Sequence, residues 1–153
     1  MFLLSNPAFF QTVANFSTIL FAVVIVLQLL LALGILPISM AWGGRQSHLT
    51  PSLRIASLAA VALLVAFIYV IRYRAGLLGV LPIPVSIKIF SWIIAAFMAF
   101  NTLGNIASSS KMEKLIFAPV TVLLTLARLI VSASSPVIDS TVKLYCFGVL
   151  INT

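Results

Sequence analysis

Four long apolar runs, separated by short polar segments, organise this chain. The first, residues 16–36, contains no charged side chain, and about 20 such residues are enough to cross the roughly 30 Å hydrocarbon core of a bilayer. Polar and turn-forming residues bound the three later runs in the same way. The pattern predicts an all-α membrane protein, a bundle of four transmembrane helices with short loops, at about residues 16–38, 51–74, 86–105 and 111–134.

Local signals predict several helix ends. Asn6-Pro7 and Thr50-Pro51 each combine an N-cap residue with a proline at the first helical position, where the missing N–H would have no partner inside the helix anyway. Ser86 is expected to cap the third helix. Gly76 can supply the left-handed residue that ends the second.

The fourth helix follows the most polar segment of the chain. Ser110 and Glu113 match the capping box, in which each side chain accepts the other residue's backbone N–H. We therefore expect this helix to start near Lys111. Pro119 is expected to kink it in its first third.

The regions outside the four spans are short. We expect residues 1–135 to form a single four-helix transmembrane domain. The apolar run 142–151 has about 10 residues, too few to span a membrane, so residues 136–153 are predicted to be a short interfacial or disordered tail. The connection 77–84 is broken by Pro and Gly and is expected to lie at the interface.

Composition supports the membrane assignment. Hydrophobic residues make up 63% of the chain and charged residues 7%, whereas about a quarter of residues are charged in soluble domains. The lipid bilayer is therefore an expected partner. The cations behind the net charge of +7 lie singly or in pairs at the ends of apolar runs, where they meet lipid headgroups. No nucleic-acid partner is expected, because no basic stripe is interleaved with aromatic residues.

The charge balance leaves the membrane orientation open. The first and third loops carry four cations, as do the second loop and the tail: Arg45, Arg54, Lys111 and Lys114 against Arg72, Arg74, Lys88 and Lys143. This tie gives no positive-inside bias and permits dual insertion. The first helix has no cation before it and two after it, so we expect the first and third loops to face the cytoplasm.

Asn101 and Asn105 form the main candidate for a functional surface. They lie four residues apart on one helix face, with Ser108 on nearly the same stripe. Each amide offers two donors and an acceptor, so this face could bind a polar headgroup, a small solute or a partner helix. Hydrogen bonding between neighbouring helices near the interface is the simpler interpretation.

Two further polar side chains are candidates. Glu113 is the only acid of the four-helix region, and its expected partner is a cation on the same side: Arg54, Arg45 or Lys114. The alternative role is a proton or cation site. Gln28 is near the middle of the first span, so it should be hydrogen-bonded in the bundle or at an oligomer interface. A place on a solute pathway is its alternative role.

Arg128 precedes the expected end of the fourth helix by about six residues. That depth is about 9 Å, and the long arginine side chain can snorkel this far to the interface. A buried role is the alternative.

The sequence shows no set of residues that would form a catalytic or metal-binding site. His48 and Cys146 are single, so neither finds a second His or Cys as a co-ligand. A serine nucleophile would need a base, and nothing in the spacing of His48 and Glu113 supports such a set. We expect no catalytic residues, no metal site and no cofactor.

Several short motifs resemble a known family. They are Trp42-Gly-Gly-Arg45, Leu53-Arg54-Ile-Ala-Ser57, Arg74-Ala-Gly76 and Asn101-Thr-Leu-Gly-Asn105-Ile-Ala-Ser108, followed by Glu113-Lys114 and Pro119. Together they resemble a family of small four-span bacterial inner-membrane proteins of unknown function. The resemblance covers about residues 18–133. It implies a multi-pass protein of the bacterial cytoplasmic membrane and brings no active site with it.

These observations favour a non-catalytic integral membrane protein with a helix-packing, accessory or scaffold role. Its partners would be the bilayer and either a second copy of the chain or another membrane protein. The alternative is a small oligomeric transporter or channel for a polar or cationic solute. Four-span multidrug exporters have a similar size, but they carry a membrane-embedded acid in the first helix, where this chain has Gln28 as the nearest equivalent.

Overall fold

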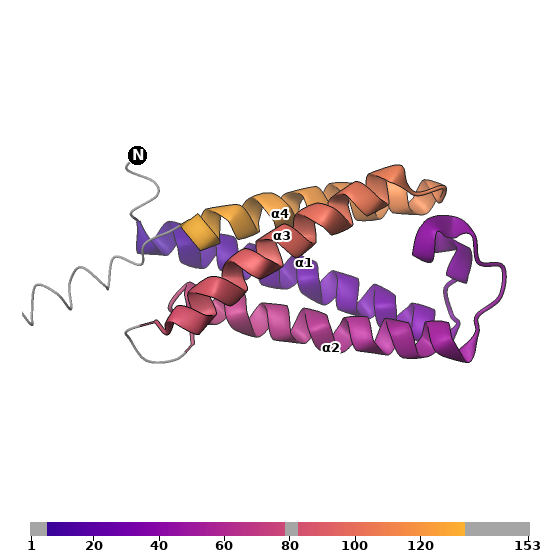
Figure 1. Cartoon of the computed structure of the whole chain (residues 1–153), viewed down its shortest axis with the longest axis horizontal. Helices are drawn as coiled ribbons and strands as arrows, with labels where there is room; N and C mark the ends of the chain where they lie inside the picture. The colour runs from indigo at the N-terminus through magenta and orange to yellow at the C-terminus, as the bar shows by residue number, and fades with distance from the viewer. Residues whose placement is uncertain (1–5, 79–82, 134–153) are drawn as a thin grey trace, which may run out of the picture.

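The chain folds into two antiparallel helix hairpins (Figure 1). A computed structural model describes residues 6–78 and 83–133 of the protein, and in this part no strand occurs. The helices are α1 (Pro7–Leu33), α2 (Pro51–Arg74), α3 (Val85–Ala107) and α4 (Ala118–Ala133). The predicted all-α four-helix bundle is confirmed. Each helix, with the fourth counted from Glu113, is long and apolar enough to cross a membrane.

Two N-caps begin helices as predicted. The Asn6 side chain accepts the Ala8 N–H at 3.0 Å, and the Thr50 hydroxyl accepts the Leu53 N–H at 3.3 Å. Because the first cap is used, α1 begins well before residue 16. It ends before residue 38 because Gly34 adopts a left-handed conformation with φ of 76°, which stops the helix.

The other two end signals have opposite outcomes. Gly76 has φ of 71° just after α2, so the predicted left-handed stop is confirmed. Ser86 is not a cap: α3 begins one residue earlier, after Pro84, and no side chain caps its first turn. The predictions for the middle of the 77–84 connection and for the 136–153 tail concern residues 79–82 and 134–153, which lie outside the described residues.

Each hairpin packs most extensively within itself, α1 on α2 and α3 on α4. The centre of the bundle joins the hairpins through a core drawn from all four helices: Phe21, Leu64, Phe67, Ile94, Met98 and Leu124. Phe67 is at its middle, with edge-on ring contacts to Phe21 at 6.1 Å and to Phe97 at 5.4 Å. Such aromatic pairs add to the energy of area burial, so the hairpins are tied firmly at mid-height.

Toward one end the two hairpins separate, and the first connection folds back between them (Figure 1). This connection holds two short turns of 3-10 type, η2 (Ile38–Met40) and η3 (Trp42–Gly44). Its apolar residues Ile38 and Ala41 are buried and form a small core with Leu31 of α1. The first loop is therefore part of the packed structure.

Arg128 is fully buried at 0% exposure. Its guanidinium points to α3, where Nη2 lies 3.4 Å from both the carbonyl and the hydroxyl oxygen of Ser91. The expectation that Arg128 snorkels to the interface is therefore wrong. The side chain is held inside the bundle because α3 supplies acceptors at its level.

The orientation remains a prediction that can be tested with two exposed positions at opposite ends of the bundle. Ser109 follows α3 and Ser86 lies in its first turn. In a Cys146→Ser background, we expect Ser86→Cys to react with a membrane-impermeant maleimide in intact cells and Ser109→Cys to be protected. Labelling of Ser109→Cys from outside would contradict a cytoplasmic position, and labelling of both variants would indicate dual insertion.

Candidate functional site

The first loop is attached to the third loop through a carboxylate. Both oxygens of Glu113 accept the backbone N–H of Gly43, at 3.1 and 3.2 Å. Glu113 is only 7% exposed. Its hydrogen-bond partner is thus a backbone amide and not one of the cations that the sequence led us to expect.

The loop segment that meets Glu113 is a tight left-handed turn, which we call the Trp42 turn (residues 41–44). Trp42 and Gly43 have φ of 58° and 80°, and the Gly44 N–H donates to the Ala41 carbonyl at 3.1 Å. These features define a type I′ turn. A bulky residue with positive φ is a genuine outlier and costs on the order of 1–3 kcal/mol, so the surrounding contacts must hold Trp42 in place.

The predicted capping box is formed only by half. The Ser110 hydroxyl accepts the Glu113 N–H at 3.4 Å, as expected. The Ser110 N–H, however, donates to the hydroxyl of Ser108 at 3.0 Å. Because Ser108 takes over the acceptor role of the carboxylate, Glu113 is available to bind the Trp42 turn.

A π-helix begins the fourth span. In η4 (Glu113–Phe117) the Ala118 N–H bonds the carbonyl of Glu113, five residues back. Pro119 explains this widening, since it has no N–H for the helix ladder and its ring would clash with a carbonyl of the preceding turn. The one extra residue rotates the start of the span by about 100° relative to α4. The predicted distortion near Pro119 therefore helps to set where Glu113 points.

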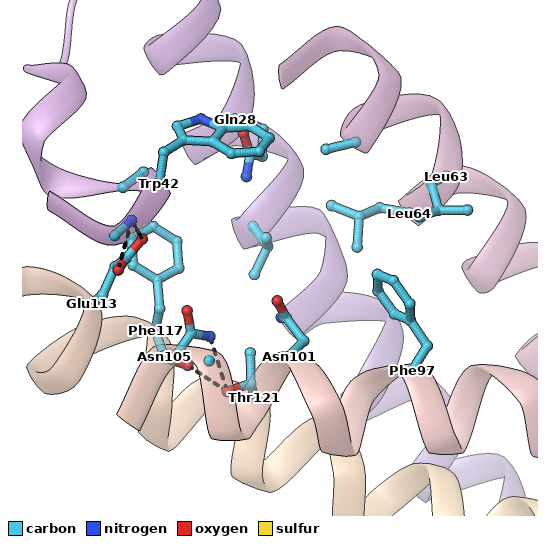
Figure 2. A pocket seen from close by; sticks show the side chains of 15 residues that line it. Gln28, Trp42, Leu63, Leu64, Phe97, Asn101, Asn105, Glu113, Phe117 and Thr121 are labelled. Atoms are coloured by element: carbon cyan, nitrogen blue, oxygen red, sulfur yellow. Dashed lines mark hydrogen bonds between the residues drawn. The ribbon is translucent and has the colours of Figure 1, made fainter. Parts of the chain in front are cut away.

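A pocket of about 380 Å³ lies below the Trp42 turn, between the two hairpins (Figure 2). All four helices, the first loop and the π-helix η4 contribute to its wall. Trp42 and Gln28 lie on one side of it, and Asn101, Asn105 and Thr121 on the other (Figure 2). Among the described residues the lining is Val24, Gln28, Ala41, Trp42, Gly43, Ala60, Leu63, Leu64, Phe97, Asn101, Gly104, Asn105, Glu113, Phe117 and Thr121.

The polar part of this wall consists of a carboxylate, three amides and a hydroxyl group. Oε1 of Gln28 is buried and has no hydrogen-bond partner. The Asn105 side-chain N–H donates to the Thr121 hydroxyl at 3.3 Å, and both residues line the pocket. Asn101 also lines the pocket, and its side chain is exposed. No Lys, Arg or His is among the lining residues.

The structure brings together four of the six candidate residues on this wall: Gln28, Asn101, Asn105 and Glu113. Ser108 is buried and accepts the Ser110 N–H, and Arg54 is exposed; neither lines the pocket.

Gln28 is about 8 Å from the end of α1 and not at mid-span, because Gly34 ends that helix early. His48 is exposed in the first loop, and the described residues hold no group of three or more His, Cys, Asp or Glu side chains that could bind a metal ion.

Sequence reasoning missed the aromatic part of the site and Thr121. Trp42 was not among the predicted site residues, whereas it covers the pocket; Phe97 and Phe117 line it from the opposite hairpin. Thr121 lies two turns after Glu113 on the fourth span. A Gly-Gly pair beside a tryptophan was the available signal, since such a pair marks a turn able to approach another backbone closely.

Comparison with known protein families, curated proteins and solved structures finds no match for this chain.

The contact between the first and third loops can be tested by substituting the two glycines of the Trp42 turn. A Cβ on Gly44 would lie 2.8 Å from the backbone nitrogen of Ser110, whereas a Cβ on Gly43 would meet nothing within 4 Å. Both alanine variants carry the strain of positive φ, about 1 kcal/mol, and only Gly44→Ala adds a backbone clash of about 1–3 kcal/mol. Unfolding in detergent micelles should therefore show a clearly larger loss of stability for Gly44→Ala. Equal losses would contradict the close contact with Ser110.

Proposed function

We propose that this chain is a non-catalytic integral membrane protein that binds a small amphipathic organic cation in the pocket below the Trp42 turn. We place it, on the resemblance noted above, in the bacterial cytoplasmic membrane. This proposal refines the alternative of a protein that handles a polar or cationic solute. The accessory helix-packing role alone gives no reason for a pocket lined by a carboxylate and three amides.

The observation that carries the proposal is a carboxylate with free acceptor sites in a wall whose described residues include no cationic side chain. A carboxylate offers about four lone-pair sites, and Glu113 receives one backbone N–H. Gln28 adds a buried oxygen without a partner, and no cationic side chain lines the wall. An ammonium group supplies the positive charge that this wall lacks and N–H donors for its free oxygens.

The rest of the pocket favours an apolar body attached to the cation. Trp42, Phe97 and Phe117 present aromatic surface, which attracts a cation placed over a ring face and packs against an apolar group. The volume of about 380 Å³ is at the low end of the range for ligand pockets, about 300–1,000 Å³. The expected ligand is thus an arylalkyl or alkyl primary amine of modest size.

The position of the pocket favours binding over passage through the bundle. From the loop end it reaches Phe97, near the middle of α3 and about 15 Å from the end of that helix. Below this level the core of Phe21, Phe67 and Met98 is packed and buried. Transport would require the hairpins to separate at the level where their aromatic side chains join them.

The binding proposal can be tested through Trp42 itself. In a Trp92→Phe variant Trp42 is the only tryptophan, so its fluorescence reports on the pocket. We expect 2-phenylethylammonium to change this fluorescence saturably and 2-phenylethanol, of similar size and uncharged, to bind at least about tenfold more weakly. A hydrogen bond to a charged group contributes about 1.5–3 kcal/mol, which corresponds to about tenfold or more in affinity.

Glu113→Gln provides the matched variant, because a glutamine keeps an acceptor for the Gly43 N–H and loses the charge. It should weaken ammonium binding about tenfold or more and leave the alcohol unchanged. Lys114→Gln alters an exposed neighbour outside the pocket and should change neither affinity by more than about twofold. Equal affinity for the two probes, or an unchanged ammonium affinity in Glu113→Gln, would contradict the proposal.

A further inference from the structure

The pocket below the Trp42 turn is open on one side. Among its described lining residues, the exposed ones are Trp42, Leu63, Phe97, Asn101 and Gly104. Leu63 lies on α2, and the last three follow one another at spacings of four and three residues on one stripe of α3. The lining residues of α1 and of the fourth span are buried or half-buried. The opening therefore lies between α2 and α3, and we call it the α2–α3 mouth (Leu63, Phe97, Asn101 and Gly104).

The packing of the helices leaves room for this mouth. Each hairpin packs most extensively within itself, and α2 and α3 belong to different hairpins. A Cβ on Gly104 would meet nothing within 4 Å, so the α3 side of the mouth borders open space. Figure 2 shows Leu63 and Phe97 at one end of the pocket and Glu113 at the other. The mouth and the carboxylate thus lie at opposite ends of the same pocket.

The loop end of the pocket, in contrast, is covered. The Trp42 turn lies over it and is fixed there by the bond between the Gly43 N–H and Glu113. Next to this bond, Gly44 approaches Ser110 so closely that a Cβ would lie 2.8 Å from the Ser110 nitrogen. The open route to the carboxylate is therefore at the side of the bundle.

This side opening lies at the level of the lipid chains. α3 has 23 residues, a length of about 34 Å, which is close to the roughly 30 Å hydrocarbon core of a bilayer. Gly104 and Phe97 are about 4 and 15 Å from the end of α3. Their neighbours on α3, Phe100 and Leu103, are 75% and 62% exposed, as expected for side chains in contact with lipid. The mouth therefore opens into one leaflet of the bilayer.

The polarity of the pocket changes along its length in the same direction as that of a lipid in this leaflet. Glu113 begins the fourth span, and Asn105 lies in the last turn of α3. The residues farthest from the loop end are apolar: Leu63 and Leu64, about 18 Å from the start of α2, and Phe97. Polar groups thus lie toward the membrane surface and apolar groups toward its middle, which is the order of a lipid's headgroup and chain.

We propose that the ligand is a single-chain alkylammonium amphiphile that enters from the bilayer through the α2–α3 mouth. This inference rests on the proposed function, because it specifies the ligand of the same pocket. The ammonium group binds Glu113, and the alkyl chain leaves the pocket between Leu63 and Phe97 and continues among the lipid chains. Each CH₂ group increases the affinity of such a chain for the bilayer, so the membrane itself concentrates the ligand at the mouth.

The test measures Trp42 fluorescence of the Trp92→Phe protein in phosphatidylcholine vesicles. One probe is dodecylammonium, whose chain must extend through the mouth, and the other is 2-phenylethylammonium, which is short enough to remain inside the pocket. Gly104→Phe places a ring in the mouth, where a Cβ has free space. It should weaken dodecylammonium binding at least about tenfold, because the ring and the chain compete for the same space. Binding of 2-phenylethylammonium should change by no more than about threefold.

Two variants control for the substitution itself. Leu103→Phe puts the same side chain on the neighbouring exposed position of α3, outside the pocket, and should change neither affinity by more than about twofold. Gly104→Ala improves the helix propensity of α3 and leaves most of the mouth free, so both probes should bind as before. If Gly104→Phe does not fold, Gly104→Leu replaces it, with the same expectation. Each probe partitions into the vesicles equally for every variant, so partitioning does not affect the comparison.

The outcomes separate this inference from the proposed function. Unchanged dodecylammonium binding in Gly104→Phe, with 2-phenylethylammonium still bound, would rule out the mouth and leave the proposed function intact. An equal loss of both probes would also rule it out, because residue 104 would then belong to the ammonium site. If neither probe binds the unchanged protein, the proposed function and this inference are both wrong.

Discussion

The site depends on one buried interaction, the bond between the Glu113 carboxylate and the Gly43 N–H. The two hairpins are joined by aromatic packing at mid-height and separate toward the loop end, where apolar side chains alone would leave the first loop free. The carboxylate fixes that loop across the gap, and the close approach of Gly44 to Ser110 excludes any larger residue there. The strained conformation of Trp42 is a consequence of this attachment, because the turn must place its N–H toward the acid.

The two ends of the bundle enclose side chains of opposite charge. The loop end encloses acceptors, a carboxylate and aromatic rings without a cation in the wall. The other end encloses Arg128, whose Nε and Nη1 atoms are buried without a hydrogen-bond partner. Both arrangements leave buried polar atoms unsatisfied, which is rare in folded proteins because each such atom costs about 1–3 kcal/mol.

Sequence reasoning recovered what is local and failed where distant segments meet. The four spans follow from uninterrupted apolar runs, and the caps at Asn6 and Thr50 act within three residues, so both could be predicted. The partner of Glu113 could not, because Gly43 is 70 residues away and its N–H is available only in a particular turn. Snorkelling of Arg128 was expected from its depth alone, whereas the acceptors on α3 hold it inside. The shared helix face of Asn101 and Asn105 was visible in the sequence, but the pocket it lines requires a loop from the other hairpin.

The most direct test of this account is amide hydrogen exchange at Gly43, measured by NMR in the unchanged protein and in Glu113→Ala. We expect slow exchange of the Gly43 amide in the unchanged protein and exchange at least about tenfold faster in the variant, since a bond to a charged group contributes more than 1 kcal/mol. The Gly44 amide, which donates to Ala41 within the turn, is the internal reference and should change less. An equal exchange rate of the Gly43 amide in both proteins would contradict the central role of the Glu113 carboxylate.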